Sequence, residues 1–569
     1  MADDEAVTAQ TMDRLVRVRA ARHAAAPMVI DPRHTLNYGE LDTTTRDLAA
    51  TLIDAGVGKG TRVGLLMPNG TEWVRIAVAL TRIGGILVPL STLLRPPELR
   101  AQLRVASVQF LVSVEEFRGR RYLDDLDLTA DDDLLLDPQL PALRHVRTPG
   151  QLTAACAAPA PPSFRQEEHA GSMRTDDQAL PAENRDERRF DAGPRAASMV
   201  DALAATVTAA DPLAVMFTSG SRGLPKAVVH SHGSAFGAVR SGLASRCIDR
   251  DTRLYLPMPF FWVGGFGGGV LSALLAGAAL ITEDIPRPET TLNLLRRERV
   301  TLFRGWPDQA ESLARQAETR GVTVPTLRPG SLEALLPAHL RAQPGARANL
   351  FGMTESFGPY CGYPADTDMP RSAWGSCGTP FPGMEVRITD PDDGRPVPTG
   401  TVGIIQIRGP HTLRGMCGRG REDVFTADGY YSTGDLGRLD DDGFLFYHGR
   451  SDDMFKVSGA TVYPGEVERA LRGIEGVSSA FVTNVPGPQG ERVAAAVVCD
   501  TATASADRLH AAARELLSSF KVPAVWLLLD SDDDVPRGPT GKVDISRLRQ
   551  RLSVREPANG TRAPVVISK

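Results

Sequence analysis

The sequence is poor in cysteine, and its cysteines form no metal-binding or disulfide pattern. There are six in 569 residues, scattered at positions 156, 247, 361, 377, 417 and 499. A zinc site needs close pairs such as CxxC, and a disulfide framework is typical of short, cysteine-rich chains. Neither kind of site is expected, and reduced thiols predict a cytoplasmic location.

The chain also lacks a strong excess of charge of either sign. Its formal net charge is -5, which is too small to predict a nucleic-acid or membrane partner. The N-terminal run MADDEAVTAQ is acidic and has no apolar core, so we expect no signal peptide.

One stretch, Val263–Thr282, carries no charge over a length that could cross a bilayer. It contains six glycines, and the preceding run YLPMPFFW contains two prolines. This composition favours a buried loop, helix and short strand. We therefore expect no membrane span.

Strands and helices alternate between residues 27 and 115. The run 38–56 places Leu41, Leu48 and Leu52 on one helical face and ends at Gly56. Strand-like runs TRVGLLM, ILVPL and FLVSV are separated by helical patterns. This alternation predicts βα units and a mostly parallel sheet. Residues 151–198 show no periodicity and are expected to be an irregular, poorly ordered insertion.

Residues 217–226 read FTSGSRGLPK and follow a short apolar run of strand length. Glycines allow a tight turn and close approach to a ligand, and successive backbone N–H groups in such a turn bind anions. Hydroxyls and a lysine add further donors. The predicted phosphate-binding residues are Thr218, Ser219, Gly220, Ser221, Gly223 and Lys226.

The stretch FTSGSRGLPKAVVHSH resembles the phosphate loop of the adenylate-forming superfamily of acyl-CoA synthetases, carrier-protein adenylation domains and luciferases. It departs at Arg222, where Thr is usual, and at Ala227, where Gly is usual. Four further segments resemble the superfamily in the expected order: NLFGMTES, YYSTGDLG, GRSDDMFKVSGATVYPGEVE and VPRGPTGKVD. The superfamily's Gly-Gly-Ala-Pro-like segment, which meets adenine and the acyl group, is replaced here by LRPGSLEALLPAHLRA.

The resemblance implies an α/β fold with a large N-terminal domain of βα-built sheets and helices, including a small β-barrel subdomain. It also implies a small mobile α+β C-terminal domain joined by a hinge. We predict domain ranges of 1–449 and 450–555, followed by a disordered tail at 556–569.

The resemblance also assigns roles to single residues. Thr354 and Glu355 would contact the α-phosphate and Mg²⁺, Asp435 the ribose hydroxyls, and Arg450 the ribose or phosphate. The remaining assignments are hinge residue Asp452, CoA-path residues Ser458 and Gly459, and two catalytic lysines, Lys542 and the C-terminal hairpin residue Lys456.

Trp262 stands where the superfamily usually has a histidine near the acyl pocket. It is either a packed core residue or a wall between the adenylate site and the acyl tunnel. Gly264 and Gly265 follow it, and the glycine-rich run predicts room for a bulky or medium-to-long apolar acid.

These features predict an AMP-forming acyl-CoA synthetase that uses ATP, Mg²⁺ and CoA. A carboxylic acid would attack the α-phosphate of ATP to give an acyl-adenylate, and a thiol would then displace AMP. Two alternatives stay open: an enzyme that loads the phosphopantetheine of a carrier protein, and a non-catalytic nucleotide-binding paralogue. The sequence predicts no oligomeric state.

Overall fold

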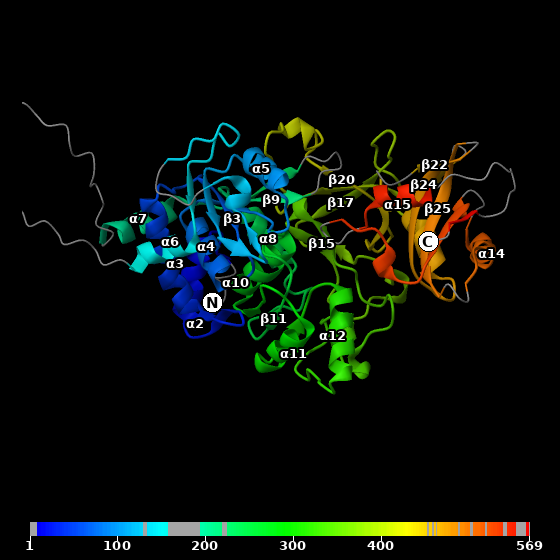
Figure 1. The fold of residues 1–569 in the computed structure, drawn as a ribbon, viewed down its shortest axis with the longest axis horizontal. Coiled ribbons are helices and arrows are strands. Elements are labelled where there is room, and N and C mark those ends of the chain that lie inside the picture. The colour runs from blue at the N-terminus through cyan, green and yellow to red at the C-terminus, as the bar shows by residue number, and fades with distance from the viewer. Residues whose placement is uncertain are drawn as a thin grey trace, which may run out of the picture. The chain divides into compact units, whose positions relative to one another are not determined.

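The computed structural model is shown in Figure 1. It describes residues 8–128, 134–157, 194–218, 225–451, 455–457, 460–462, 464–487, 490–500, 504–517, 521–538, 543–553 and 565–567. The chain forms two compact units. Unit 1 comprises Met1–Asp368, Phe381–Gly383 and Pro410–Asp423, and unit 2 comprises Met369–Pro380, Met384–Gly409 and Val424–Lys569. The predicted boundary between residues 449 and 450 stays a prediction.

Unit 1 contains a seven-stranded sheet in the order β19-β10-β9-β4-β3-β5-β8. Its parallel part runs from β9 to β8, and β10 and β19 are antiparallel additions at one edge. The strands are β3 (Arg62–Leu66), β4 (Ile86–Pro89), β5 (Phe110–Ser113), β8 (His145–Arg147), β9 (Pro212–Thr218), β10 (Lys226–Ser231) and β19 (Gly415–Met416). The predicted βα pattern and the strand before the phosphate loop are confirmed.

The helices between these strands begin and end where the local sequence indicates. Helix α3 (Tyr38–Asp54) starts at a capping box formed by Asn37 and Glu40. Gly56, with φ of 88°, ends that turn in a conformation that favours glycine. Helices α4 (Thr71–Arg82) and α5 (Pro96–Val105) follow β3 and β4.

A second sheet of unit 1 has the order β13-β11-β12-β1-β2. Strand β12 pairs in parallel with β1 and β11, and β11 with β13, so four strands share one direction. The strands are β1 (Pro27–Ile30), β2 (Thr35–Asn37), β11 (Arg253–Tyr255), β12 (Ala279–Ile281) and β13 (Leu302–Phe303). Ligands of parallel sheets bind beyond the carboxyl ends of the strands, which places the segments after β11 and β13 at a candidate ligand edge.

The glycine-rich stretch between β11 and β12 forms α9 (Val263–Gly265), a π-helix η2 (Phe266–Leu271) and α10 (Ser272–Ala276). Most of its side chains are buried, including Phe266, which packs edge-on against Trp73. Within the described part of the chain, no helix is both long and apolar enough to cross a bilayer. The predicted buried loop, helix and short strand are confirmed.

Gly264 and Gly265 do not provide the room predicted beside Trp262. A Cβ at Gly265 would lie 2.0 Å from the Pro259 carbonyl oxygen, and one at Gly264 would lie 2.7 Å from the Met258 Sδ. Both glycines therefore permit close packing of the segment before α9. The prediction of a bulky or medium-to-long apolar acid loses this support.

Two predictions of irregular structure are too wide. Helices α6 (Pro149–Ala157) and α7 (Pro194–Thr206) extend into both ends of the predicted insertion at 151–198. Its central residues 158–193 lie outside the described part. In the predicted tail, β27 (Val565–Ile567) pairs in parallel with β26 (Val525–Leu529). A short β-branched run completes the sheet edge there, which composition alone did not reveal.

Unit 2 begins with an antiparallel sheet in the order β17-β18-β20-β21. Its strands are β17 (Glu385–Thr389), β18 (Gly403–Arg408), β20 (Tyr431–Leu439) and β21 (Leu445–Arg450). Where the resemblance implied a small β-barrel subdomain, these strands form a four-stranded antiparallel sheet.

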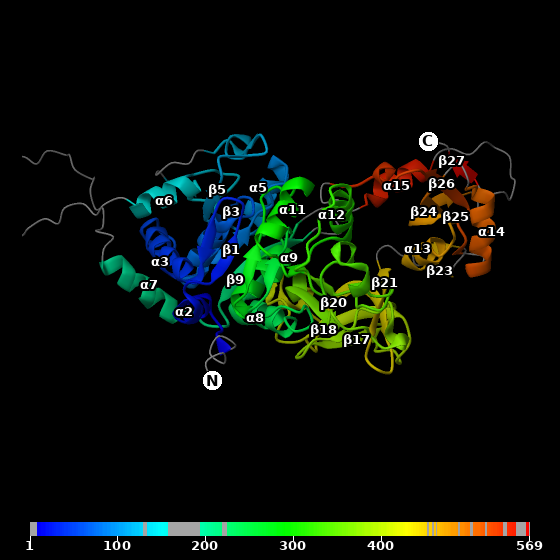
Figure 2. The same cartoon turned by 90° about the horizontal axis from the view of Figure 1, so that it is seen from below.

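The C-terminal part of unit 2, drawn in orange and red in Figure 2, has an α+β arrangement. A hairpin of β22 (Phe455–Val457) and β23 (Ala460–Val462) precedes α13 (Pro464–Arg472), β24 (Val477–Gly487) and β25 (Gly490–Cys499). One face of the β24-β25-β26 sheet packs against α13 and α14 (Ala506–Leu516), and the other packs against α15 (Ile545–Leu552). Successive residues of β25 point to opposite faces of the sheet, so its alternating alanines and valines pack into the cores on both sides.

Candidate active site

The predicted phosphate loop joins two paired strands. Thr218, the last residue of β9, is the register partner of Lys226, the first residue of β10. Residues 219–224 lie outside the described part, so the predicted roles of Ser219, Gly220, Ser221 and Gly223 stay predictions. The hairpin holds Thr218 and Lys226 side by side at the two ends of the loop.

His230 connects strand β10 to the segment that carries Thr354 and Glu355. Its ring Nε2 lies 2.8 Å from the Thr354 carbonyl oxygen, and its ring meets that of Phe357 edge-on at 4.8 Å. Burial lowers the pKa of His230 to about 4, so the ring is neutral near pH 7. Because a carbonyl only accepts, Nε2 carries the proton and donates it. The sequence interpretation missed this residue, which gave no local signal.

Thr354 and Glu355 occupy a tight turn between two short strands. The turn is the 3-10 helix η5 (Thr354–Ser356), which connects β14 (Phe351–Met353) to β15 (Gly358–Gly362). Phe357 closes it with φ of 52°, a conformation uncommon for a bulky residue and a mark of functional segments. The Glu355 residue is 3% exposed, and its carbonyl accepts a hydrogen bond of 2.7 Å from the Leu413 N–H.

The segment after Leu413 ties the same turn to the phosphate strand a second time. Strand β19 pairs antiparallel with β10, with Met416 opposite Val228. The Arg414 N–H also donates to the Val229 carbonyl at 2.8 Å. The turn and strand β10 are thus fixed to each other through His230 and through residues 413–416.

Asp435 and Arg450 are neighbours in unit 2. Antiparallel pairing of β20 and β21 makes them register partners, and the Arg450 Nη1 lies 3.2 Å from the Asp435 Oδ1. Thr433 supports both, since its hydroxyl accepts from the Asp435 N–H at 3.0 Å and its carbonyl accepts from Arg450 at 2.9 Å. Asp435 and Arg450, which were predicted from separate motifs to bind the nucleotide, therefore lie in contact with each other.

Trp262 precedes α9 and is half-buried. Its ring stands nearly perpendicular to that of Trp306, at 88° and a centroid distance of 5.8 Å. Trp306 is 37% exposed. The aromatic pair reaches the surface of unit 1, so Trp262 is not a fully packed core residue. Its role as a wall of the acyl pocket stays a prediction.

The remaining predicted residues are only partly described. The Lys456 backbone lies in β22, paired with Thr461. Asp452, Ser458, Gly459 and Lys542 lie outside the described part, so their roles stay predictions. Among the described residues, no group of three or more His, Cys, Asp or Glu side chains gathers to hold a metal.

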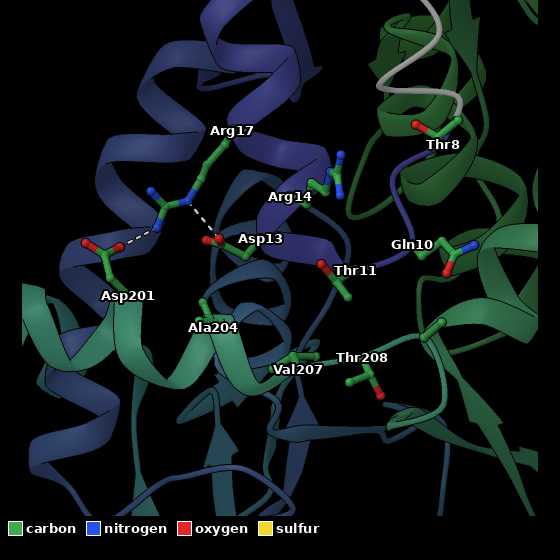
Figure 3. Close-up of a pocket in the computed structure, with 12 residues that line it drawn as sticks. Thr8, Gln10, Thr11, Asp13, Arg14, Arg17, Asp201, Ala204, Val207 and Thr208 are labelled. Carbon is green, nitrogen blue, oxygen red and sulfur yellow. Dashed lines mark hydrogen bonds and ion pairs between the residues drawn. The ribbon is translucent and has the colours of Figure 1, made fainter.

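A cavity of about 650 Å³ lies elsewhere in unit 1, between α2 (Met12–His23) and α7. Figure 3 shows Arg17 bridging Asp13 and Asp201 at its wall. None of the predicted site residues lines it.

Comparisons with known proteins agree with the motifs. The family model described as "AMP-binding enzyme" matches residues 16–416. A Mycobacterium tuberculosis protein named as a CoA ligase of a methyl-dioxo-octahydroindenyl propanoyl group is 30% identical, over 97% of this chain and 100% of that protein. The fatty acid–[acyl-carrier-protein] ligase ScoC of Streptomyces coeruleorubidus is 28% identical, over 95% of this chain and 96% of its own length.

The fold has solved counterparts as well. The ATP-bound MatB of Rhodopseudomonas palustris superposes with a TM-score of 0.72 at 23% identity, over 95% of this chain and 98% of that one. At this identity the likeness establishes the fold, which is that of α/β adenylate-forming enzymes.

Proposed function

The chain belongs to the AMP-binding enzyme family, and from this premise we propose how it works as an AMP-forming acid–CoA ligase. A carboxylate attacks the α-phosphate of ATP, which gives an acyl-adenylate and pyrophosphate. The CoA thiol then displaces AMP and forms the thioester. The observation that carries the proposal is the hydrogen bond from His230 to Thr354, because it joins the phosphate strand to the Thr354–Glu355 turn.

The first step brings two anions together, so positive charge and donors must offset the repulsion. We assign this task to Lys226, to the donors of residues 218–223, and to Lys542 from the C-terminal region. Thr354 would contact the α-phosphate. Asp435 accepts from the ribose hydroxyls, and Arg450, which already pairs with it at 3.2 Å, holds it in place.

Mg²⁺ fits the same assignment. This ion prefers one or two carboxylates together with phosphate oxygens and water, rather than a cage of protein ligands. Glu355 supplies one carboxylate on a fixed turn, which matches that preference. When bound, the ion would neutralise charge on the phosphates.

The second step needs a different approach to the carbonyl carbon. We propose that the C-terminal region turns about Asp452, so that Lys542 leaves and the hairpin with Lys456, Ser458 and Gly459 shapes the path of CoA. Such hinge motions complete many two-step active sites.

For the acid itself, we propose a bulky molecule with a ring. Two features support this: the named substrate of the 30% identical relative carries a bicyclic ring system on a propanoyl chain, and the Trp262–Trp306 pair offers flat apolar surface. We further propose a cytoplasmic location, where ATP and CoA are supplied.

A carrier-protein thiol is the second candidate acceptor, because ScoC, a relative of similar length, is named for that acceptor.

Labelled ATP–pyrophosphate exchange across a panel of ring-bearing, fatty and short-chain acids tests the first step. Thioester formation with free CoA, compared with a phosphopantetheinyl carrier protein, tests the second. Exchange with no acid in the panel would contradict ligase activity, and thioester formed on the carrier protein alone would replace CoA as acceptor.

A further inference from the structure

Two arginines of unit 1, Arg246 and Arg304, have no carboxylate within ion-pair distance among the residues that the structure describes. Arg246 is only 7% exposed, and its Nε and Nη2 donate to the carbonyls of Gly242 and Val239 at 3.1 and 3.0 Å. Arg304 donates from Nη2 to the Arg246 carbonyl at 3.0 Å. Among the described residues, no Asp or Glu forms an ion pair within 4.0 Å of either guanidinium.

Another buried arginine of the same unit shows the usual arrangement. Arg82 is fully buried, and its Nη2 lies 2.6 Å from Asp13 and 2.8 Å from Asp42. Burying a charge without a counter-charge is costly, which is why buried cations are normally paired in this way. Arg246 and Arg304 instead lie close enough to repel each other, and burial lowers the pKa of both to about 10.

Arg304 retains unused donor capacity. Its Nε is inaccessible to solvent and has no hydrogen-bond partner among the described residues. The exposed Asp366 attracts the guanidinium electrostatically but is not within ion-pair distance. A buried N–H without an acceptor is uncommon in a native structure and calls for a specific explanation.

The position of Arg304 points to a ligand. It directly follows β13, and its backbone N–H donates to Tyr255, the last residue of the parallel neighbour β11, at 3.0 Å. This is the carboxyl edge of the sheet, where ligands of parallel sheets bind. Trp262 and the partly exposed Trp306 follow the same two strands and meet at 5.8 Å.

Arg246 faces the π-helix η2. A Cβ on Gly268 would lie 3.9 Å from the Arg246 Nη1 and 3.8 Å from Leu256, with nothing closer. A Cβ there would only reach ordinary van der Waals contact, so the backbone of η2 lies beside the Arg246 guanidinium without crowding it. π-Helical turns often occur at functional sites.

We propose that Arg304, backed by Arg246, binds a second oxygen-bearing group of the acid substrate, remote from the carboxylate that is activated. The inference rests on the proposed ligase function, since it concerns the acid of that reaction. The substrate class is a ring-bearing carboxylic acid with a ketone or a second carboxylate on the ring. An accepting oxygen there would offset a guanidinium charge that has no carboxylate within ion-pair distance among the described residues, and its loss would leave that charge uncompensated.

Three matched acids test this by ATP–pyrophosphate exchange: cyclohexylpropanoate, its ring-ketone analogue and its ring-carboxylate analogue. We expect kcat/KM of the native enzyme to favour an oxygenated acid by about tenfold or more, as for hydrogen bonds to charged groups. Which analogue wins identifies ketone or carboxylate as the recognised group.

Arg304→Met should bring the ratio of kcat/KM values for the oxygenated acid and cyclohexylpropanoate close to one. Arg304→Lys should keep part of the preference, because lysine provides the charge without the planar fork. Arg297→Met on α11 (Pro288–Arg297) is the matched control, since that side chain is 57% exposed and pairs with Glu298. The control should retain the native preference. Should Arg304→Met prove insoluble, Arg304→Lys decides.

The inference would be overturned if the native enzyme showed no preference for an oxygenated acid, or if the Arg304 variants retained that preference in full. Absence of exchange with all three acids and with the wider panel would instead contradict the proposed function. Exchange with cyclohexylpropanoate at the same efficiency as with its analogues would leave the ligase function standing and remove the role of Arg304.

Discussion

Replacing His230 with phenylalanine isolates one hydrogen bond between the phosphate strand and the Thr354–Glu355 turn. The new ring keeps most of the volume and the edge contact with Phe357, which lies at 4.8 Å. It removes the donor to the Thr354 carbonyl at 2.8 Å. A buried acceptor left without a partner costs about 1–3 kcal/mol. The change also removes the His230 Nδ1, which is buried and has no partner among the described residues, so His230→Phe should lower the free energy of unfolding by less than that full amount.

The same change should affect the chemistry more than the fold. Thr354 and Glu355 are positioned through this bond, and a displacement of a catalytic group by about 1 Å can cost on the order of 10²-fold in rate. We expect kcat for ATP–pyrophosphate exchange to fall by about ten- to hundredfold. His230→Gln, which restores an N–H donor of similar reach, should recover part of the loss.

His232 supplies the matched control. It is also fully buried, but neither ring nitrogen has a hydrogen-bond partner among the described residues. His232→Phe should therefore leave exchange unaltered and stability unchanged or increased. Guanidinium titration and initial-rate exchange assays measure both quantities. Native-like exchange by His230→Phe, or equal losses in the two phenylalanine variants, would refute the positioning role of His230.

Four further predictions concern stability and the two half-reactions. Burial lowers the pKa of His230 and His232 from 6.5 to about 4. As the pH falls, these histidines protonate first in the unfolded chain, so the free energy of unfolding should decline between pH 6.5 and pH 4 by about 3 kcal/mol for each histidine. Unchanged guanidinium midpoints across that range would exclude this. Asp435→Ala should raise the Kd for ATP about ten- to hundredfold by stranding ribose hydroxyls and Arg450, and an unchanged calorimetric Kd would remove Asp435 from the site. Lys542→Ala should reduce ATP–pyrophosphate exchange by roughly 10³-fold but should slow thioester formation from supplied acyl-adenylate far less. Asp452→Pro should slow thioester formation and spare exchange. If either variant slowed both steps equally, the hinge mechanism would be contradicted. Trp262→Ala should shift kcat/KM towards larger acids, and an identical acid profile would make Trp262 a packing residue.

The sequence by itself determined the βα units and the positions of the motifs. Strand β9, helix α3 with its capping box, and the stop at Gly56 all follow from residues within a few positions of one another. Local backbone conformation depends on such near neighbours, so hydrophobic periodicity and turn residues are enough to predict it. The order of the five motifs likewise predicted the family without any structure.

Tertiary structure alone decided which of these residues meet. His230 and Thr354 are 124 positions apart, and their hydrogen bond depends on how unit 1 places the turn beside β10. Asp435 pairs with Arg450 only because β20 and β21 adopt one antiparallel register. Gly264 and Gly265 permit close packing instead of leaving room. No described carboxylate lies within ion-pair distance of Arg246 or Arg304. Contacts of this kind are set by sheet register and by packing between distant segments, which local sequence patterns do not encode.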